Sequence, residues 1–135
     1  MAKRTGIHAI LIDPYARTVI AVEVDGELSG YYKALECRTI EAAYIFGSGA
    51  NFCYVDEEGL LGGQSCGFET TSGERVMGRA LVVREGRNGS TTSTVKTVEQ
   101  VRAVVAHWIG EPDVDVDALV EEELLNTNPL FGSFG

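Results

Sequence analysis

The pattern of apolar and polar positions in the first quarter of the chain predicts a β-hairpin. Residues 7–12 form an apolar run broken only by His8, which is typical of a strand buried on both faces. Residues 13–16 (Asp-Pro-Tyr-Ala) are a strong turn signal, because proline presets φ and aspartate accepts local backbone hydrogen bonds. Residues 18–24 then place three aliphatic side chains on one face of a second strand.

The middle of the chain carries a helix pattern and further strand patterns. Apolar residues at helical spacing from Leu28 to Leu35 predict a short helix. Residues 39–46 and 51–55 predict two strands joined by the glycine-containing connection 47–50. A polar turn follows, and an irregular segment begins at Leu60. Beyond it we expect one core strand over residues 75–84 and a Gly-, Ser- and Thr-rich loop over residues 86–94.

Residues 97–109 carry the strongest helix signal. Thr97 and Gln100 form a capping-box pattern, in which each side chain accepts a hydrogen bond from the other residue's backbone N–H. Six apolar residues follow on one stripe: Val98, Val101, Val104, Val105, Trp108 and Ile109. Gly110 and Pro112 end this pattern, and a last helix is predicted over residues 117–125.

These elements predict the α+β class. We expect an antiparallel or mixed β-sheet with the main amphipathic helix, 97–109, packed on one face and with short helices elsewhere. The 135 residues, 44% of them hydrophobic, are enough for one core, and no repeat or linker divides them. We therefore expect one domain over residues 1–110, followed by an acidic helical segment and an apolar tail over residues 111–135.

Composition predicts a cytoplasmic location. No apolar run reaches the ~20 residues of a membrane span, and the N-terminal stretch is too short for a signal peptide. Cys37, Cys53 and Cys66 are an odd number without a C-x-x-C pair, as expected of small buried or half-buried residues in a reducing compartment. Together with His8 and His107 they match no zinc spacing, so no metal and no cofactor is predicted.

The net charge of −9 is concentrated near the C-terminus. Residues 1–110 contain 13 acids and 11 bases, whereas residues 111–123 contain seven acids and no base. A protein with this net negative charge is repelled by the phosphate backbone of nucleic acids, so direct nucleic-acid binding is not expected. Asp113, Asp115 and Asp117 resemble the start of an EF-hand loop, but Ala118 and Leu124 occupy its glycine and glutamate positions. A solvated acidic segment able to approach a basic protein surface is the better interpretation.

The glycine-rich segments offer a ligand-binding hypothesis. Residues 47–49 lack the third glycine and the following helix of a dinucleotide fingerprint, and the 86–94 loop lacks the ending of a P-loop. That loop could still contact a small anion with Arg79, Arg84 and Arg87. No nucleophile with a nearby base and no carboxylate pair in separate environments is recognisable, so no catalytic residue is predicted.

The tail contains three large apolar residues, Leu130, Phe131 and Phe134. Burying them is worth several kcal/mol at ~25 cal/mol per Å². They either close the protein's own core or dock onto a second copy or a partner. Deletion of residues 127–135 separates these alternatives, since it destabilises the monomer in the first case and changes assembly in the second.

Several stretches together resemble a known group of proteins. They are residues 10–14 with 22–24, residues 32–35, residues 54–60, and residues 78–82 ahead of the Thr97–Gln100 cap. In this combination, over residues 7–110, the chain resembles small uncharacterised proteins of phages, prophages and plasmids, a domain of unknown function. The matching polar or glycine positions include Asp56, Gly59, Gly78 and Arg79. The resemblance implies a setting in a mobile element and supplies no catalytic residue.

Small mobile-element proteins often bind and block a host component, and some sequester signalling nucleotides. The leading hypothesis is a non-catalytic protein that binds a host protein, for example as an anti-defence inhibitor. The partner-binding residues would be Asp113, Asp115, Asp117, Leu130, Phe131 and Phe134. One alternative is a small-ligand or signalling-nucleotide-binding protein that uses Arg79, Arg84 and Arg87, and another is an unrecognised enzyme. A homodimer or higher homo-oligomer would give the apolar tail a place to dock.

Overall fold

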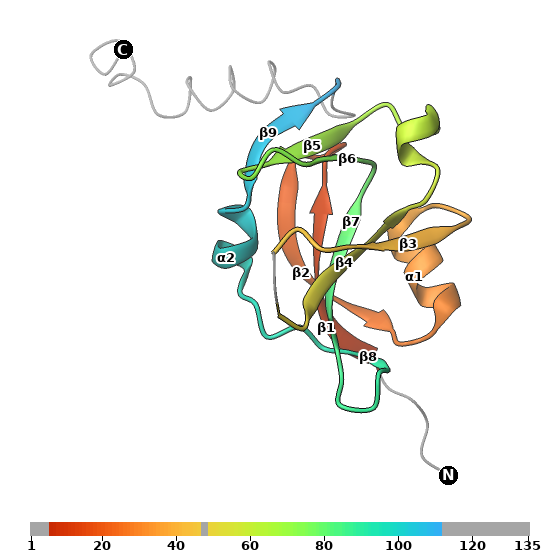
Figure 1. The fold of residues 1–135 in the computed structure, drawn as a ribbon. Coiled ribbons are helices and arrows are strands. Elements are labelled where there is room, and N and C mark those ends of the chain that lie inside the picture. The colour runs from red at the N-terminus through yellow and green to blue at the C-terminus, as the bar shows by residue number, and fades with distance from the viewer. Residues whose placement is uncertain (1–5, 47–48, 112–135) are drawn as a thin grey trace, which may run out of the picture.

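The computed structural model of the chain describes residues 6–46 and 49–111 (Figure 1). These residues form nine strands, two α-helices and one short 3-10 helix. The strands are β1 (Gly6–Asp13), β2 (Thr18–Asp25), β3 (Ile40–Ala43), β4 (Asn51–Asp56), β5 (Gly67–Thr70), β6 (Arg75–Met77), β7 (Ala80–Glu85), β8 (Thr91–Thr92) and β9 (Val105–Ile109). The helices are α1 (Leu28–Leu35), the 3-10 helix η1 (Gly59–Leu61) and α2 (Val98–Arg102).

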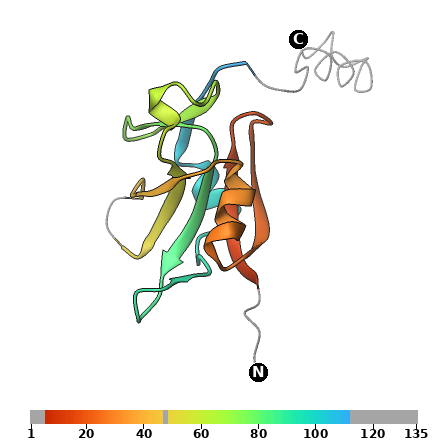
Figure 2. The same cartoon turned by 90° about the vertical axis from the view of Figure 1, so that its right-hand side faces the viewer.

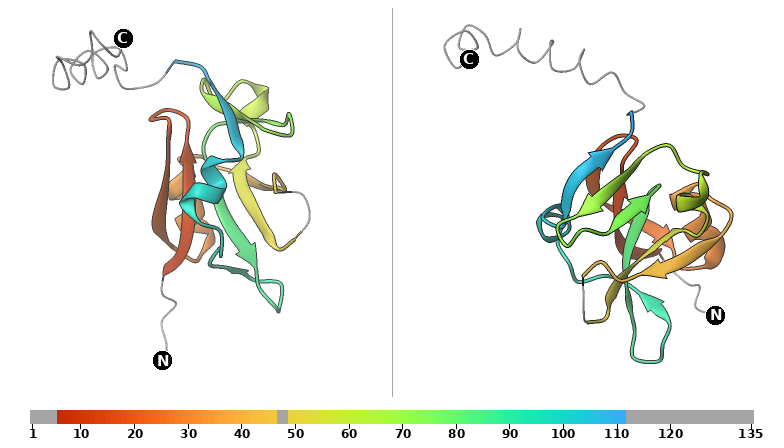
Figure 3. Two further views of the ribbon diagram at one scale, coloured as in Figure 1. Left: turned by 90° about the vertical axis from the view of Figure 1, so that its left-hand side faces the viewer. Right: turned by 45° about the horizontal axis from the view of Figure 1, so that its top comes forward.

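The described strands form two antiparallel sheets. The larger sheet has six strands in the order β2-β1-β7-β4-β3, with β8 paired to the end of β7. The smaller sheet has the order β6-β5-β9. Helix α1 lies on one side of the larger sheet (Figure 2), and α2 and β9 lie on the other (Figure 3). The predicted α+β class is confirmed, and of the expected antiparallel or mixed pairing the described strands show the antiparallel form, in two sheets.

The larger sheet is buried on both faces, because its central strands alternate between two apolar clusters. Ile10 and Ile12 of β1 belong to the cluster that faces the smaller sheet and α2. Ile7 and Ala9 of the same strand belong to the cluster under α1. Strand β7 divides its four fully buried apolar residues between the two clusters in the same way. The prediction that residues 7–12 are buried on both faces is therefore confirmed.

The local elements predicted in the first half of the chain are present. Strands β1 and β2 pair over eight residues, from Gly6 opposite Asp25 to Asp13 opposite Thr18. Helix α1 covers the predicted residues, and the hairpin expected over residues 39–55 is formed by β3 and β4. Each of these elements has its signals within a few neighbouring residues.

The helix predicted over residues 97–109 is wrong in its extent. Its capping box forms, since Gln100 N–H donates to Thr97 Oγ1 (3.1 Å) and Thr97 N–H donates to Gln100 Oε1 (2.9 Å). Helix α2 nevertheless ends at Arg102, and Val105–Ile109 form β9, which pairs with β5. Trp108 packs edge-on against Phe68 of β5, with ring centroids 6.4 Å apart. Valine, isoleucine and tryptophan are also favourable in strands. Pairing with β5 therefore makes these residues a strand, although their spacing also fits a helix.

The single core strand predicted over residues 75–84 is also wrong. Gly78 has a φ of 98°, in the left-handed region that glycine enters at low cost, and it turns the chain from β6 in the smaller sheet into β7 in the larger. Besides β9, two short strands were not predicted. Strand β5 lies in the segment expected to be irregular, and β8 lies in the expected 86–94 loop.

The predictions made for residues 112–135 concern a part of the chain that the structure does not describe. The helix expected over residues 117–125 and the apolar tail lie outside the described residues. Neither described α-helix is long and apolar enough to cross a membrane.

Candidate functional site

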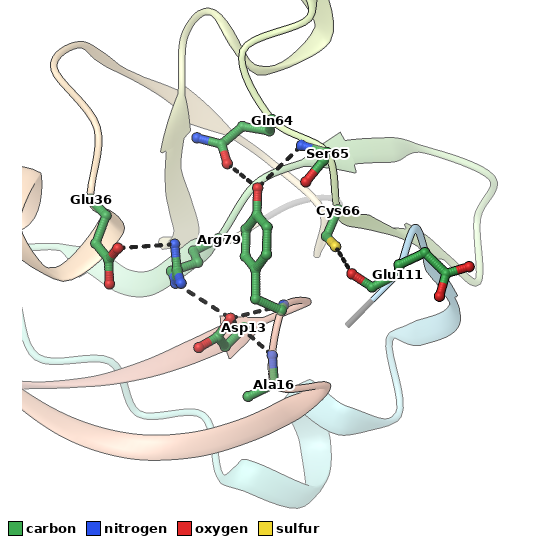
Figure 4. Close-up of polar contacts among 9 residues, drawn as sticks. Asp13, Ala16, Glu36, Gln64, Ser65, Cys66, Arg79 and Glu111 are labelled. Atoms are coloured by element: carbon green, nitrogen blue, oxygen red, sulfur yellow. Dashed lines mark hydrogen bonds and ion pairs between the residues drawn. The ribbon is translucent and has the colours of Figure 1, made fainter. Parts of the chain in front are cut away.

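A polar cluster around Arg79 joins four connections of the fold (Figure 4). The Arg79 guanidinium lies between two carboxylates, with Nε 3.3 Å from Asp13 Oδ1 and Nη1 3.6 Å from Glu36 Oε1. Its central carbon lies 4.6 Å from the centre of the Tyr15 ring. Only 13% of the Arg79 side chain is exposed. We call this group, with Gln64 added, the Arg79 cluster.

Local sequence places the acidic members of this cluster. Asp13 ends β1, and its Oδ1 accepts hydrogen bonds from the N–H groups of Tyr15 (3.0 Å) and Ala16 (3.4 Å), which forms the predicted turn. Glu36 ends α1 in the left-handed conformation, with a φ of 54°, and its N–H donates to Tyr32 O. Both carboxylates therefore sit where an element ends, and Arg79 reaches them from the β6–β7 connection.

A chain of hydrogen bonds extends the cluster towards β4. Tyr15 Oη donates to Gln64 Oε1 (2.5 Å) and accepts from Ser65 N–H (3.2 Å), and Gln64 Nε2 donates to Asp56 Oδ2 (2.7 Å). Gly78 allows Gln64 to take this position, because a Cβ added at Gly78 would lie 2.9 Å from Gln64 Cγ. The segment between η1 and β5 is thereby fixed to the β1–β2 turn.

Three of the four polar or glycine positions named for the sequence resemblance lie in this cluster or against it. Asp56, Gly78 and Arg79 all belong to it or contact it, although 22 positions separate Asp56 from Gly78. Their contacts give these three residues a structural role, because they hold the connections between strands and helices together. The roles of Tyr15 and Gln64 were missed by sequence reasoning, because Tyr15 was read only as part of the turn, Gln64 lies in no motif, and their contact spans 49 positions.

The three arginines proposed for ligand binding do not form one site. Arg79 precedes β7, whereas Arg84 lies near its other end, and six residues of strand span roughly 17 Å. Arg84 Nε donates to Ser93 O (3.0 Å), and Arg87 is exposed in the turn between β7 and β8. The six partner-binding residues predicted near the C-terminus, Asp113, Asp115, Asp117, Leu130, Phe131 and Phe134, lie outside the described residues.

The cysteines are buried or half-buried as predicted, and Cys37 and Cys53 are poor nucleophiles. All three thiols are free, with Cys53 and Cys66 buried and Cys37 half-buried. Burial, and next to it the negative charge of Asp56, raises the pKa of the Cys37 thiol above its usual value, against a lowering by the hydrogen bond to Thr39 O. Burial alone raises the pKa of the Cys53 thiol far above its usual value. Both thiols therefore stay protonated at neutral pH. Within residues 6–46 and 49–111, no three His, Cys, Asp or Glu side chains are grouped to hold a metal ion.

An open groove of about 610 Å³ lies between α1 and β2. Its floor is apolar and half-buried, formed by Leu11, Val22, Val24 and Ala34 where the cluster under α1 reaches the surface. Its rim is exposed and charged, with Glu23 and Asp25 on the β2 side and Lys33 on α1. We call this feature the α1–β2 groove.

The groove runs beside an edge strand whose outer backbone groups face away from the sheet. His8 N–H donates to Ser93 Oγ (2.9 Å) and His8 O accepts from Thr94 N–H (3.0 Å), so the backbone of His8 points away from β2. His8 is paired with Glu23, and antiparallel pairs alternate between bonded and non-bonded, so Glu23 and Ala21 direct their N–H and C=O groups outward. A backbone added at this edge would meet these groups.

The two-sheet fold, with its Arg79 cluster and its edge-strand groove, defines a small α+β domain protein. The chain belongs to the family described as domain of unknown function DUF3846, whose model matches residues 7–108. This match confirms that the resemblance is to a domain of unknown function. A comparison with curated proteins found no match. A comparison with solved structures found none either.

Proposed function

We propose that the protein is a non-catalytic binding protein that captures an extended segment of a host protein at β2 and in the α1–β2 groove. The observation that carries this proposal is the combination of an apolar groove floor with an outward-facing strand edge beside it. Extended peptides bind sheet edges through main-chain hydrogen bonds, and pockets beside the edge select alternate side chains.

The groove sets the chemistry of the captured segment. Alternate residues of a strand added to β2 would point to the α1 side, where Val22, Val24 and Ala34 offer apolar contacts. Glu23 and Asp25 lie on the β2 side of the rim and favour a lysine or arginine in the segment. The net charge of −9 adds a long-range attraction for a basic surface. The partner segment is therefore extended, apolar on one face and basic.

The resemblance to proteins of mobile elements suggests in which cell, and with what kind of partner, this binding takes place. In a phage or plasmid setting the partner is a protein of the host cytoplasm, and blocking it is the simplest consequence of occupying one of its segments. Inhibition of a defence protein is one form of this function.

Native mass spectrometry of the full chain, purified gently from its host, tests the proposal with three variants. Ala34→Arg fills the groove, and Glu23→Lys reverses the charge of its rim at an exposed position. Ala106→Arg makes the same change as the first variant at an exposed position on β9 and serves as the matched control. The wild-type chain and Ala106→Arg are expected to carry a host protein, and the two groove variants are expected to lose it while keeping the same unfolding midpoint.

Other outcomes separate the alternatives. A host protein held equally by Ala34→Arg and Glu23→Lys would contradict the groove as the site and leave binding to the C-terminal residues. A small mass that leaves on denaturation, and that Arg84→Gln and Arg87→Gln release, would replace the proposal by the ligand-binding alternative. A bare chain from every preparation would contradict capture of a stable partner and turn attention to substrate screening.

A further inference from the structure

A second groove, on the opposite face of β2, combines two arginines with apolar side chains. It has a volume of about 310 Å³, and its lining includes Arg17 and Ile20 from the β1–β2 hairpin, Arg102 from α2, and Val105 and Trp108 from β9. Ile20 is 46% exposed, and Trp108 and Val105 are half-buried. We call it the Arg17–Arg102 groove.

Neither arginine has a carboxylate partner among the described residues. Arg17 Nη2 donates to Gly110 O (2.9 Å), and Arg102 Nη2 makes a long contact of 3.4 Å to Val19 O. Both ion pairs found in residues 6–46 and 49–111 belong to Arg79. The groove therefore presents two guanidinium groups that retain donors for an anionic ligand.

The chain itself supplies such a ligand at this point. Arg17 holds the carbonyl of Gly110, the residue directly before the acidic stretch 111–123, which contains seven acids and no base. Asp113, Asp115 and Asp117 alternate with valines in sequence, so one short segment offers carboxylates for the arginines and apolar side chains for Val105 and Trp108. Two to six residues beyond Glu111 extend over roughly 7–20 Å, which is enough to enter the groove.

We propose that the acidic stretch of this same chain, residues 112–123, docks into the Arg17–Arg102 groove. The tether favours this occupant, because a short linker gives an effective concentration on the order of millimolar, which a free acidic partner must exceed. The proposal is independent of the α1–β2 groove. It assigns Asp113, Asp115 and Asp117 an intramolecular partner, in place of the host partner expected from sequence.

Trp108 reports on this docking, because it lines the groove and is the single tryptophan of the chain. The test measures Trp108 emission and its quenching by acrylamide in the full chain. In Asp113→Asn/Asp115→Asn/Asp117→Asn the emission is expected to shift to longer wavelength and the quenching to increase. In Arg17→Asn/Arg102→Gln the same changes are expected, and the combined variant should show no further change. High salt should move the wild type to the value of the variants, since it screens the pairing.

The matched control removes three acids from another surface. Glu41→Gln/Glu57→Gln/Glu58→Gln changes the net charge equally at exposed positions and should leave Trp108 unchanged. Reversing the charge at Arg102 and in the acidic stretch together, with Arg102→Glu/Asp113→Lys/Asp115→Lys/Asp117→Lys, should restore the wild-type quenching. Equal quenching in wild type and in the 113/115/117 variant would overturn the proposal. A signal that is lost on dilution would also overturn it, because it would assign the groove to the acidic stretch of a second copy.

Discussion

Arg79 stacks its guanidinium over the ring of Tyr15, 4.6 Å from the ring centre, while it pairs with Asp13 at the base of the same turn. The arginine enters from the β6–β7 connection, and the tyrosine lies in the β1–β2 turn. One side chain thus fixes the turn of the N-terminal hairpin to the point where the chain passes from the smaller to the larger sheet.

Replacement of Arg79 by leucine is expected to destabilise the fold by about 2 kcal/mol, between the values for exposed and fully buried ion pairs. The loss follows because the Asp13 carboxylate, with a side chain 18% exposed, would remain without its cation. The free energy of unfolding in urea measures the effect.

Glu36→Gln is the matched control for this prediction. The Glu36 side chain is 66% exposed, so water screens its pairing with Arg79, and the loss should stay below about 0.5 kcal/mol. Equal losses in the two variants would show that the Asp13 pair is not the main contribution of Arg79.

Gly78→Ala is expected to destabilise the protein more than Gly73→Ala. Both glycines have positive φ, 98° and 94°, so alanine is strained at each position. An added Cβ at Gly73 meets no atom within 4 Å, whereas at Gly78 it meets Gln64 Cγ at 2.9 Å. We expect about 1 kcal/mol for Gly73→Ala and about 2 kcal/mol for Gly78→Ala, because the second variant also displaces Gln64. Thermal and urea unfolding of the two variants measure the difference. Equal losses would mean that Gln64 moves away at no cost.

The parts of this fold that sequence predicts well are those whose signals are local. The β1–β2 hairpin was predicted correctly because the Asp13-Pro14 turn and the apolar run next to it are continuous in sequence. The start of α2 was predicted correctly because Thr97 and Gln100 satisfy each other's backbone groups within one turn.

The missed parts depend on distant residues. Val101, Val104 and Trp108 fit a helical stripe, but the backbone from Val105 onward pairs with β5, which lies more than 30 positions earlier. Strand β5 itself begins at Gly67, where a Cβ would lie 2.2 Å from Val76 O. The close approach of Val76 requires glycine at this position, and glycine is not a residue that predicts a strand. The α1–β2 groove has no motif either, because it arises where α1 packs on β2.

Thr97→Ala is expected to lower the free energy of unfolding by about 1 kcal/mol, the usual value for loss of a helix N-cap. The threonine hydroxyl accepts the N–H of Gln100, and alanine leaves that donor without this partner. Thr97→Ser retains the hydroxyl and should recover most of the loss, since serine caps at least as well. If serine and alanine behave alike at position 97, the capping hydrogen bond contributes little.

The buried Cys53 thiol predicts a loss of stability at alkaline pH. Burial raises its pKa in the folded protein well above the ordinary value of 9.0 that applies to the unfolded chain. A raised folded-state pKa gives a contribution that is fully present below pH 9 and is lost as the pH rises, because only the unfolded thiol then releases its proton. From pH 7 to pH 10 this amounts to about 1 kcal/mol.

Urea unfolding of wild type and Cys53→Ala at a series of pH values isolates this contribution, because all other titrating groups are shared. The variant has a lower stability at pH 7, since Cys53 is fully buried, but its stability should fall less steeply between pH 8 and pH 10. Cys53→Val refills the space with an apolar side chain and should show the same shallow dependence. Parallel curves for wild type and both variants would mean that the folded thiol titrates near its ordinary pKa, and therefore that water reaches Cys53 in the folded protein.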